Sequence, residues 1–212
     1  MIKAIFFDND GVLADSEKLF FRATREILAG ANIELTTEKF IELTLIDNKG
    51  GWKLARDKNF SEAQIDELRT QRNILYEDYL YSENILIDSV EMTIKYLHGK
   101  YKLGIVTSSK KLHFDIIHKR KDILKYFDFV LTREDYVKSK PDPEPYLKAV
   151  EISGFSKEDC VVVEDSQRGL EAAYEAGLKC IIIPNEFTIN SDFTKAWKVL
   201  NSISELKDIL KT

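Results

Sequence analysis

The stretch that most constrains the fold is KAIFFDNDGVL, residues 3–13. Its apolar run, Ile5 to Phe7, is typical of a strand buried in a parallel sheet. The run stops at two acids, Asp8 and Asp10, which a glycine follows. In open α/β sheets ligands bind just beyond the carboxyl ends of the strands, where two carboxylates can hold a hard cation or attack an electrophile. An Asx-rich turn without a chemical role is the alternative, and other segments of the chain decide between the two.

Composition excludes several classes of function. The chain has 212 residues, of which 44% are hydrophobic and 32% charged, so we expect a folded core. The net charge is -5, and acids and bases are mixed along the chain without a basic block, which argues against a nucleic-acid partner. No apolar run approaches the ~20 residues needed to span a membrane, and no signal-peptide pattern opens the chain. We therefore expect a cytoplasmic protein, a monomer or weak dimer, that binds neither membrane nor nucleic acid.

The cysteines and histidines suggest no additional metal site. Cys160 and Cys180 each open an apolar run, and we expect both to be buried free thiols. The three histidines, His98, His113 and His118, share no metal-ligand spacing. We expect all three on helix surfaces.

Strand-like runs alternate with helical segments over most of the chain. Each apolar run ends in small or polar residues. This alternation implies a parallel sheet covered on both faces, so the expected fold class is α/β with a Rossmann-like core. The predicted strands are residues 4–7, 103–106, 129–131, 161–163 and 180–183, and helical segments between the later ones are predicted at 115–124, 145–150 and 167–176.

Residues 15–84 differ from the rest because they contain helical patterns and no convincing strand. Ser61 and Gln64 fit a capping box that opens a long helix. We therefore predict an α/β core domain over residues 1–14 and 85–212, with an all-helical cap domain inserted at 15–84. An insert at this point is expected over the carboxyl end of the sheet, where it can act as a lid. An insert that merely adds surface is the alternative.

Two further segments carry polar residues that suit phosphate. The strand at 103–106 ends in hydroxyl residues that begin with Thr107 and Ser108, and a helix is expected from Lys110. A hydroxyl and backbone N–H groups at a helix start can hold phosphate oxygens, although a plain N-cap has the same pattern. Lys140 stands directly before Pro141 in a proline-rich loop, which would hold its ammonium in place to offset phosphate charge.

A second pair of acids, Glu164 and Asp165, follows the apolar strand at 161–163. Adjacent acids repel each other unless a cation joins them, and nothing in folding requires two there. Together with Asp8 and Asp10, they could form one oxygen-lined site suited to Mg²⁺.

These four segments, in this order and spacing, resemble the motifs of the haloacid dehalogenase-like hydrolase superfamily. The chain looks most like the branch that contains beta-phosphoglucomutase and the small sugar-phosphate phosphatases. The resemblance covers essentially the whole chain, and its most specific part combines DNDGVL at 8–13 with EDS at 164–166. It implies a small phosphorylated metabolite, such as a sugar or polyol phosphate, as the substrate.

The resemblance also implies a role for each matching residue. Asp8 would be the nucleophile that forms an aspartyl-phosphate, and Asp10 would be the general acid and then the general base. Mg²⁺ would be held by Asp8, the backbone carbonyl of Asp10 and Asp165, with Glu164 as an additional acid. The resemblance further implies that Thr107 and the N–H of Ser108 would contact phosphoryl oxygens. Lys140 would neutralise charge near Asp8.

The second acid separates the reaction types of this superfamily. Haloacid dehalogenases lack it and phosphonate-cleaving relatives replace it, so the presence of Asp10 favours a C–O–P substrate. Beta-phosphoglucomutase carries a histidine a few residues into its first cap helix, and the corresponding stretch here, residues 16–21, has none. We therefore predict a phosphatase. The alternatives are a sugar phosphate mutase and a non-catalytic relative that binds a phosphorylated ligand.

Substrate choice is expected to lie in the cap. The stretch at 45–53 is the candidate loop, because two glycines at 50–51 allow unusual backbone angles. Asn48, Lys49 and Trp52 are the candidate substrate contacts. A plain turn between helices, with Trp52 in the cap core, is the alternative.

Overall fold

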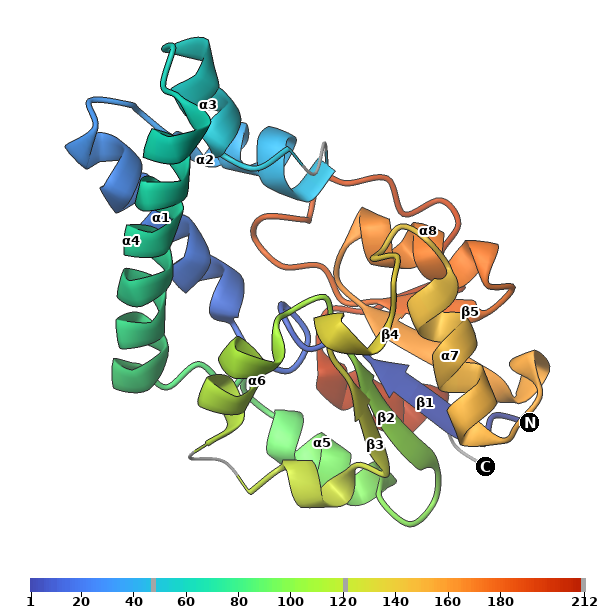
Figure 1. Ribbon diagram of the computed structural model, residues 1–212. Helices are drawn as coiled ribbons and strands as arrows, with labels where there is room; N and C mark the ends of the chain where they lie inside the picture. Colours follow the sequence, from blue (N-terminus) through green and yellow to red (C-terminus); the bar gives the residue numbers. More distant parts are fainter. Residues whose placement is uncertain (47–48, 120–121, 211–212) are drawn as a thin grey trace. The chain divides into compact units, whose positions relative to one another are not determined.

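The computed structural model describes residues 1–46, 49–119 and 122–210. The chain divides into two units. One comprises Met1–Asp15 and Ile85–Thr212, and the other is Ser16–Asn84. The first unit holds the sheet and the second is made of helices (Figure 1).

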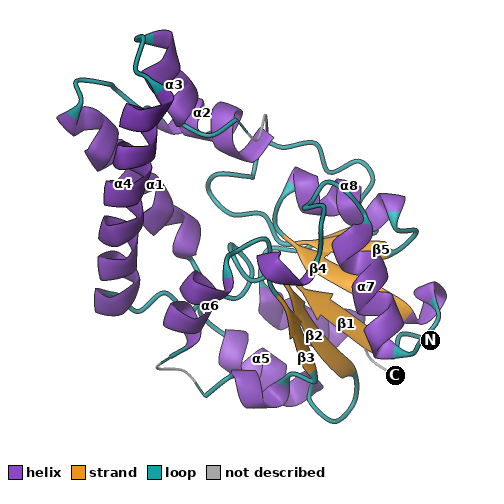
Figure 2. Ribbon diagram, viewed as in Figure 1, coloured by secondary structure: helices purple, strands orange, loops and turns teal. Residues whose placement is uncertain are grey.

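The first unit is built on a six-stranded sheet in the order β3-β2-β1-β4-β5-β6, and each neighbouring pair is parallel (Figure 2). Phe7 pairs with Ile105 on one side and with Val163 on the other, so β1, β2 and β4 end at the same edge. The predicted parallel α/β sheet is thus confirmed. The strands are β1 (Ala4–Phe7), β2 (Lys102–Val106), β3 (Phe129–Leu131), β4 (Cys160–Glu164), β5 (Lys179–Ile182) and β6 (Lys198–Val199).

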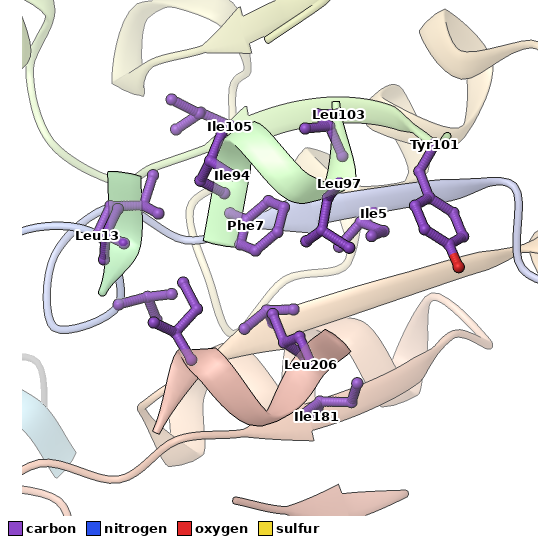
Figure 3. Packing of buried hydrophobic residues seen from close by; sticks show 14 of the residues in the cluster. Ile5, Phe7, Leu13, Ile94, Leu97, Tyr101, Leu103, Ile105, Ile181 and Leu206 are labelled. Carbon is purple, nitrogen blue, oxygen red and sulfur yellow. The ribbon is translucent and has the colours of Figure 1, made fainter. Parts of the chain in front are cut away.

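Helices cover both faces of the sheet because alternate side chains of a strand point to opposite faces. Ile5 and Phe7 pack in one core with residues of α5 (Val90–Leu97) and α9 (Leu206–Ile209), as Figure 3 shows. Ala4 and Phe6 pack in a second core with α7 (Glu144–Ser153) and α8 (Gln167–Glu175). All four β1 side chains are fully buried, which explains why this strand reads as a continuous apolar run.

The second unit is formed by α1 (Ser16–Gly30), α2 (Thr37–Phe40), a π-helical segment (Ile41–Ile46), α3 (Trp52–Asp57) and α4 (Glu62–Ser82). The predicted capping box is present, since Ser61 and Gln64 exchange hydrogen bonds at the start of α4. Arg72 of α4 is buried against aromatic rings, with its guanidinium 4.1 Å from the ring of Phe20.

The structure differs from the predicted elements at several points, and α5 is a helix that was not predicted. The helix α6 (Lys111–His118) ends at His118 instead of continuing to Leu124, which lies in a separate 3-10 turn. Ile123, just before that turn, is also buried. The apolar spacing therefore continues past the end of the helix, and for this reason the predicted helix was too long. The two-residue strand β6 was not predicted, because two residues carry no period. His118 was expected on a helix surface but is buried, because α6 directs its side chain into the interior of the first unit.

Cys160 and Cys180 are free and buried, as predicted. No helix in residues 1–46, 49–119 and 122–210 is long and apolar enough to cross a membrane.

Candidate active site

Charged and polar side chains gather where β1, β2 and β4 end. Asp8 follows β1, Thr107 follows β2, and Glu164 is the last residue of β4. The side chain of Lys140 joins them from the loop before α7. Four residues that are far apart in sequence are therefore neighbours, because parallel strands in this register end at one edge.

Lys140 is buried and its ammonium has three partners. The Nζ atom donates to Asp8 Oδ1 at 2.8 Å, to Glu164 Oε1 at 2.7 Å and to the carbonyl oxygen of Val106 at 2.9 Å. Arg168 of α8 in turn donates from Nη2 to the carbonyl oxygen of Lys140 at 2.7 Å. The ammonium is thus held between both acid-bearing strands, a position that satisfies all three of its donors.

Both oxygens of the Glu164 carboxylate accept hydrogen bonds. Oε1 accepts from Lys140 and from the hydroxyl of Tyr146 at 2.7 Å, and Oε2 accepts from the Ser166 hydroxyl at 3.0 Å. A Cβ on Gly169 would lie 1.8 Å from the Glu164 carboxyl carbon, so α8 passes this close only because residue 169 is glycine. Tyr146 and Gly169 were not predicted as site residues, since nothing in their local sequence marks a contact across the fold.

Burial and charge act against each other in this cluster. Burial alone would raise the pKa of Glu164, but the Lys140 ammonium holds it below its ordinary value. Burial would lower the pKa of Lys140, but the carboxylates of Asp8 and Glu164 hold it above its ordinary value. For Asp8, burial raises the pKa, and Lys140 opposes that rise without cancelling it, because the negative charges of Glu164 and Asp10 raise it further.

Asp10 is held by two hydroxyl groups from the segment after β2. Its Oδ2 accepts from Thr107 Oγ1 at 3.0 Å and from Ser109 Oγ at 2.8 Å. The backbone N–H of Ser109 also donates to Thr107 Oγ1, which orients that hydroxyl. Ser108 is exposed at the same strand end. Ser109 was not predicted as a contact, although it belongs to the same run of hydroxyl residues.

Asp8, Glu164 and Asp165 form a buried group whose carboxylate oxygens lie within 4.8 Å of one another. Asp165 is further fixed by Asn185, whose Nδ2 donates to Oδ2 at 2.7 Å. A Cβ on Gly11 would lie 2.3 Å from that same oxygen, so the loop after β1 approaches Asp165 closely. Three carboxylates and one ammonium meet here. The carboxylate oxygens and the excess of negative charge suit a divalent hard cation.

The proposed cap contacts lie in the second unit. Trp52 is 6% exposed, and the Arg72 guanidinium lies 5.5 Å from its ring, so its environment favours the packing alternative. Lys49 is exposed. Asn48 lies outside the described residues, and its predicted role stays a prediction.

This chain matches a known protein family and several known proteins. The family model described as haloacid dehalogenase-like hydrolase matches residues 5–183. Protein CbbY of Rhodobacter capsulatus is 27% identical over 210 residues, which cover 93% of this chain and 92% of that protein. The phosphorylated carbohydrates phosphatase of Thermotoga maritima is 29% identical over 185 residues, which cover 85% of this chain and 84% of that protein.

A solved structure of a related protein is similar to this chain over almost its whole length. The crystal structure of a CbbY variant from Rhodobacter sphaeroides in complex with xylulose-(1,5)bisphosphate superimposes with a TM-score of 0.81 at 26% identity. The match covers 97% of this chain and 96% of that chain. The similarity thus includes both units of the fold.

Proposed function

The chain belongs to the haloacid dehalogenase-like hydrolase family, and we propose that it is a magnesium-dependent phosphomonoester hydrolase for a small sugar or polyol phosphate. The observation that carries the proposal is the ammonium of Lys140, which bridges Asp8 and Glu164 inside a buried carboxylate cluster. A carboxylate whose charge is offset in this way can approach an anionic phosphoryl group.

Asp8 is the proposed nucleophile. An oxygen of its carboxylate attacks phosphorus and the bond from phosphorus to the leaving oxygen breaks, which leaves an aspartyl-phosphate. Lys140 donates to Oδ1 at 2.8 Å, so it fixes the carboxylate and offsets negative charge as the two groups meet.

Asp10 is the proposed acid and base. It gives a proton to the leaving oxygen in the first step and takes one from water in the second. That water attacks phosphorus, the bond to Asp8 breaks, and inorganic phosphate leaves, with Asp8 again a carboxylate and Asp10 again protonated. Thr107 is the proposed partner of a phosphoryl oxygen; its hydroxyl stands at the end of β2 and donates to Asp10.

Asp8, the backbone carbonyl of Asp10 and Asp165 are the proposed holders of Mg²⁺. The bound ion supplies positive charge that offsets the phosphoryl oxygens and keeps Asp8 ionised. Glu164 is a weaker candidate ligand, because both of its oxygens already accept hydrogen bonds from Lys140, Tyr146 and Ser166.

The relatives support a phosphorylated sugar as the substrate. One is named a phosphorylated carbohydrates phosphatase, and one was crystallised with xylulose-(1,5)bisphosphate. The helical unit Ser16–Asn84 is the proposed cap that selects the leaving group, with Lys49 as its proposed contact.

The test is phosphate release from a panel of sugar, polyol and nucleotide phosphates, with Mg²⁺ and with EDTA. We expect release that requires Mg²⁺, concentrates on one class of sugar phosphate, and disappears in Asp8→Asn at unchanged melting temperature. Isomerisation of a sugar phosphate faster than release of phosphate would favour the mutase. Activity that survives Asp8→Asn would contradict the nucleophile assignment.

A further inference from the structure

A buried histidine lies behind the proposed nucleophile loop. His118, the last residue of α6, is 3% exposed, and its Nε2 lies 2.7 Å from Oδ1 of Asn9. Asn9 is fully buried and stands between Asp8 and Asp10. The pair joins residues 109 positions apart in sequence.

Asn9 is the point at which the loop after β1 is anchored. Its carbonyl oxygen accepts the N–H groups of Leu13 at 2.8 Å and Ala14 at 2.9 Å, which close the turn. Its side chain is held by His118, so both its main chain and its side chain are tied. The peptide groups on either side of Asn9 belong to Asp8 and Asp10, and any shift of Asn9 moves the two acids.

His118 also belongs to the segment that holds Asp10 from the other side. Thr107 and Ser109, which donate to Asp10, lead directly into α6, and His118 ends that helix. The two segments are therefore joined twice, once at the site by hydroxyl groups and once behind it by the imidazole. Two connections between the same segments leave less freedom for their relative displacement than one.

The imidazole is neutral near pH 7. Burial lowers the pKa of His118 to about 4 and outweighs the opposing attraction of the Asp10 and Asp115 carboxylates. With Oδ1 of Asn9 as acceptor, Nε2 carries the hydrogen and donates it. The contact therefore orients the loop without adding charge behind the carboxylate cluster.

Folding stability does not account for this pair. Among the described residues, Nδ1 of His118 and Nδ2 of Asn9 have no hydrogen-bond partner, although both atoms are buried. A buried polar group without a hydrogen-bond partner destabilises the fold, so two apolar side chains of similar size would fold at least as well. Polar pairs that weaken a core are characteristic of sites that serve function.

We propose that His118 is a positioning residue, which holds Asn9 so that Asp8 and the backbone carbonyl of Asp10 keep the geometry needed for phosphoryl transfer and for Mg²⁺. This inference rests on the proposed function.

The test compares His118→Gln, which keeps an N–H donor, with His118→Phe, which keeps an aromatic ring but has no donor. His113→Phe on the same helix is the matched control. With para-nitrophenyl phosphate as probe, we expect kcat of His118→Phe to fall about tenfold or more with little change in KM. His118→Gln should recover most of kcat. The melting temperature of His118→Phe should stay close to that of wild type, because the variant leaves Oδ1 of Asn9 without a donor but also removes the unpaired Nδ1.

A second readout does not depend on turnover. The affinity for Mg²⁺ alone, measured by calorimetry, should fall about tenfold in His118→Phe and stay unchanged in His113→Phe. Equal kcat and equal Mg²⁺ affinity in His118→Phe and wild type would overturn the inference, as would failure of His118→Gln to recover either. A wild-type chain that releases no phosphate from any ester would instead refute the proposed function, and the Mg²⁺ affinities would still decide the role of His118.

Discussion

The ammonium of Lys140 lies 2.8 Å from Oδ1 of Asp8, although 132 residues separate the two. The same Nζ atom lies 2.7 Å from Glu164, so one positive charge serves two carboxylates from neighbouring strands. Because all three groups are buried, removal of the ammonium leaves two carboxylates without compensation in a medium of low dielectric.

Lys140→Met tests the ammonium. We expect kcat to fall about 100-fold or more, because the charge that offsets the phosphoryl group is lost. We also expect the free energy of unfolding to fall by about 3–5 kcal/mol at pH 7, since Asp8 and Glu164 would face each other without a cation. Urea unfolding and phosphate release measure the two effects. Lys138→Met, in the same loop but exposed, is the control and should change neither.

Gly169→Ala tests the close approach of α8 to Glu164. The added Cβ would lie 1.8 Å from the carboxyl carbon, so either Glu164 or α8 must shift, which disturbs the contact of Glu164 with Lys140. We expect both stability and phosphate release to fall. The control is Gly30→Ala in α1, where a Cβ meets nothing within 4 Å, and stability should rise by up to about 1 kcal/mol. Equal behaviour of the two variants would contradict the packing described for α8.

Tyr146→Phe removes one hydrogen bond and keeps the ring. The Tyr146 hydroxyl donates to Glu164 Oε1 at 2.7 Å, and burial raises the pKa of that hydroxyl well above its ordinary value, so it remains a donor. Loss of a bond to a charged acceptor should lower the free energy of unfolding by about 1.5–3 kcal/mol. Denaturant unfolding of Tyr146→Phe beside Tyr174→Phe, an exposed tyrosine, measures the difference.

Stability should depend on pH through His118. Its pKa is about 4 in the folded chain and about 6.5 when unfolded, so only the unfolded chain takes up the proton between these values. Stability is therefore fully present above about pH 6.5 and is lost as the pH falls toward 4, by up to about 3 kcal/mol. Urea unfolding of wild type and His118→Phe across this range should show a smaller loss in the variant. Parallel curves would show that His118 does not titrate as described.

Lys49→Ala tests the proposed cap contact. If Lys49 meets the leaving group of the substrate, the variant should raise KM for the preferred sugar phosphate and leave hydrolysis of para-nitrophenyl phosphate unchanged. Lys58→Ala, another exposed lysine of the helical unit, is the control. An equal change for both substrates would assign Lys49 a role unrelated to substrate choice.

Local sequence patterns determined the five longer strands of the core and the presence of several helices. The apolar runs at β1 and β4 are continuous because both faces of these strands are buried, and that property is visible in the sequence alone. The acids Asp8, Asp10, Glu164 and Asp165 stood out for a related reason. Charged side chains close to a buried strand cost free energy of folding unless they are paired, hydrogen-bonded or bound to a cation.

Only the tertiary structure decided which side chains meet. Tyr146 and Gly169 enter the site because α7 passes beside β1 and β2 and α8 passes beside β4, and neither contact leaves a local signal. His118 was expected on a surface because its side chain is polar, although it stands four residues after the buried Phe114 and so lies on the same face of α6. Its partner, Asn9, is 109 residues away, and only the folded chain brings the two within 2.7 Å.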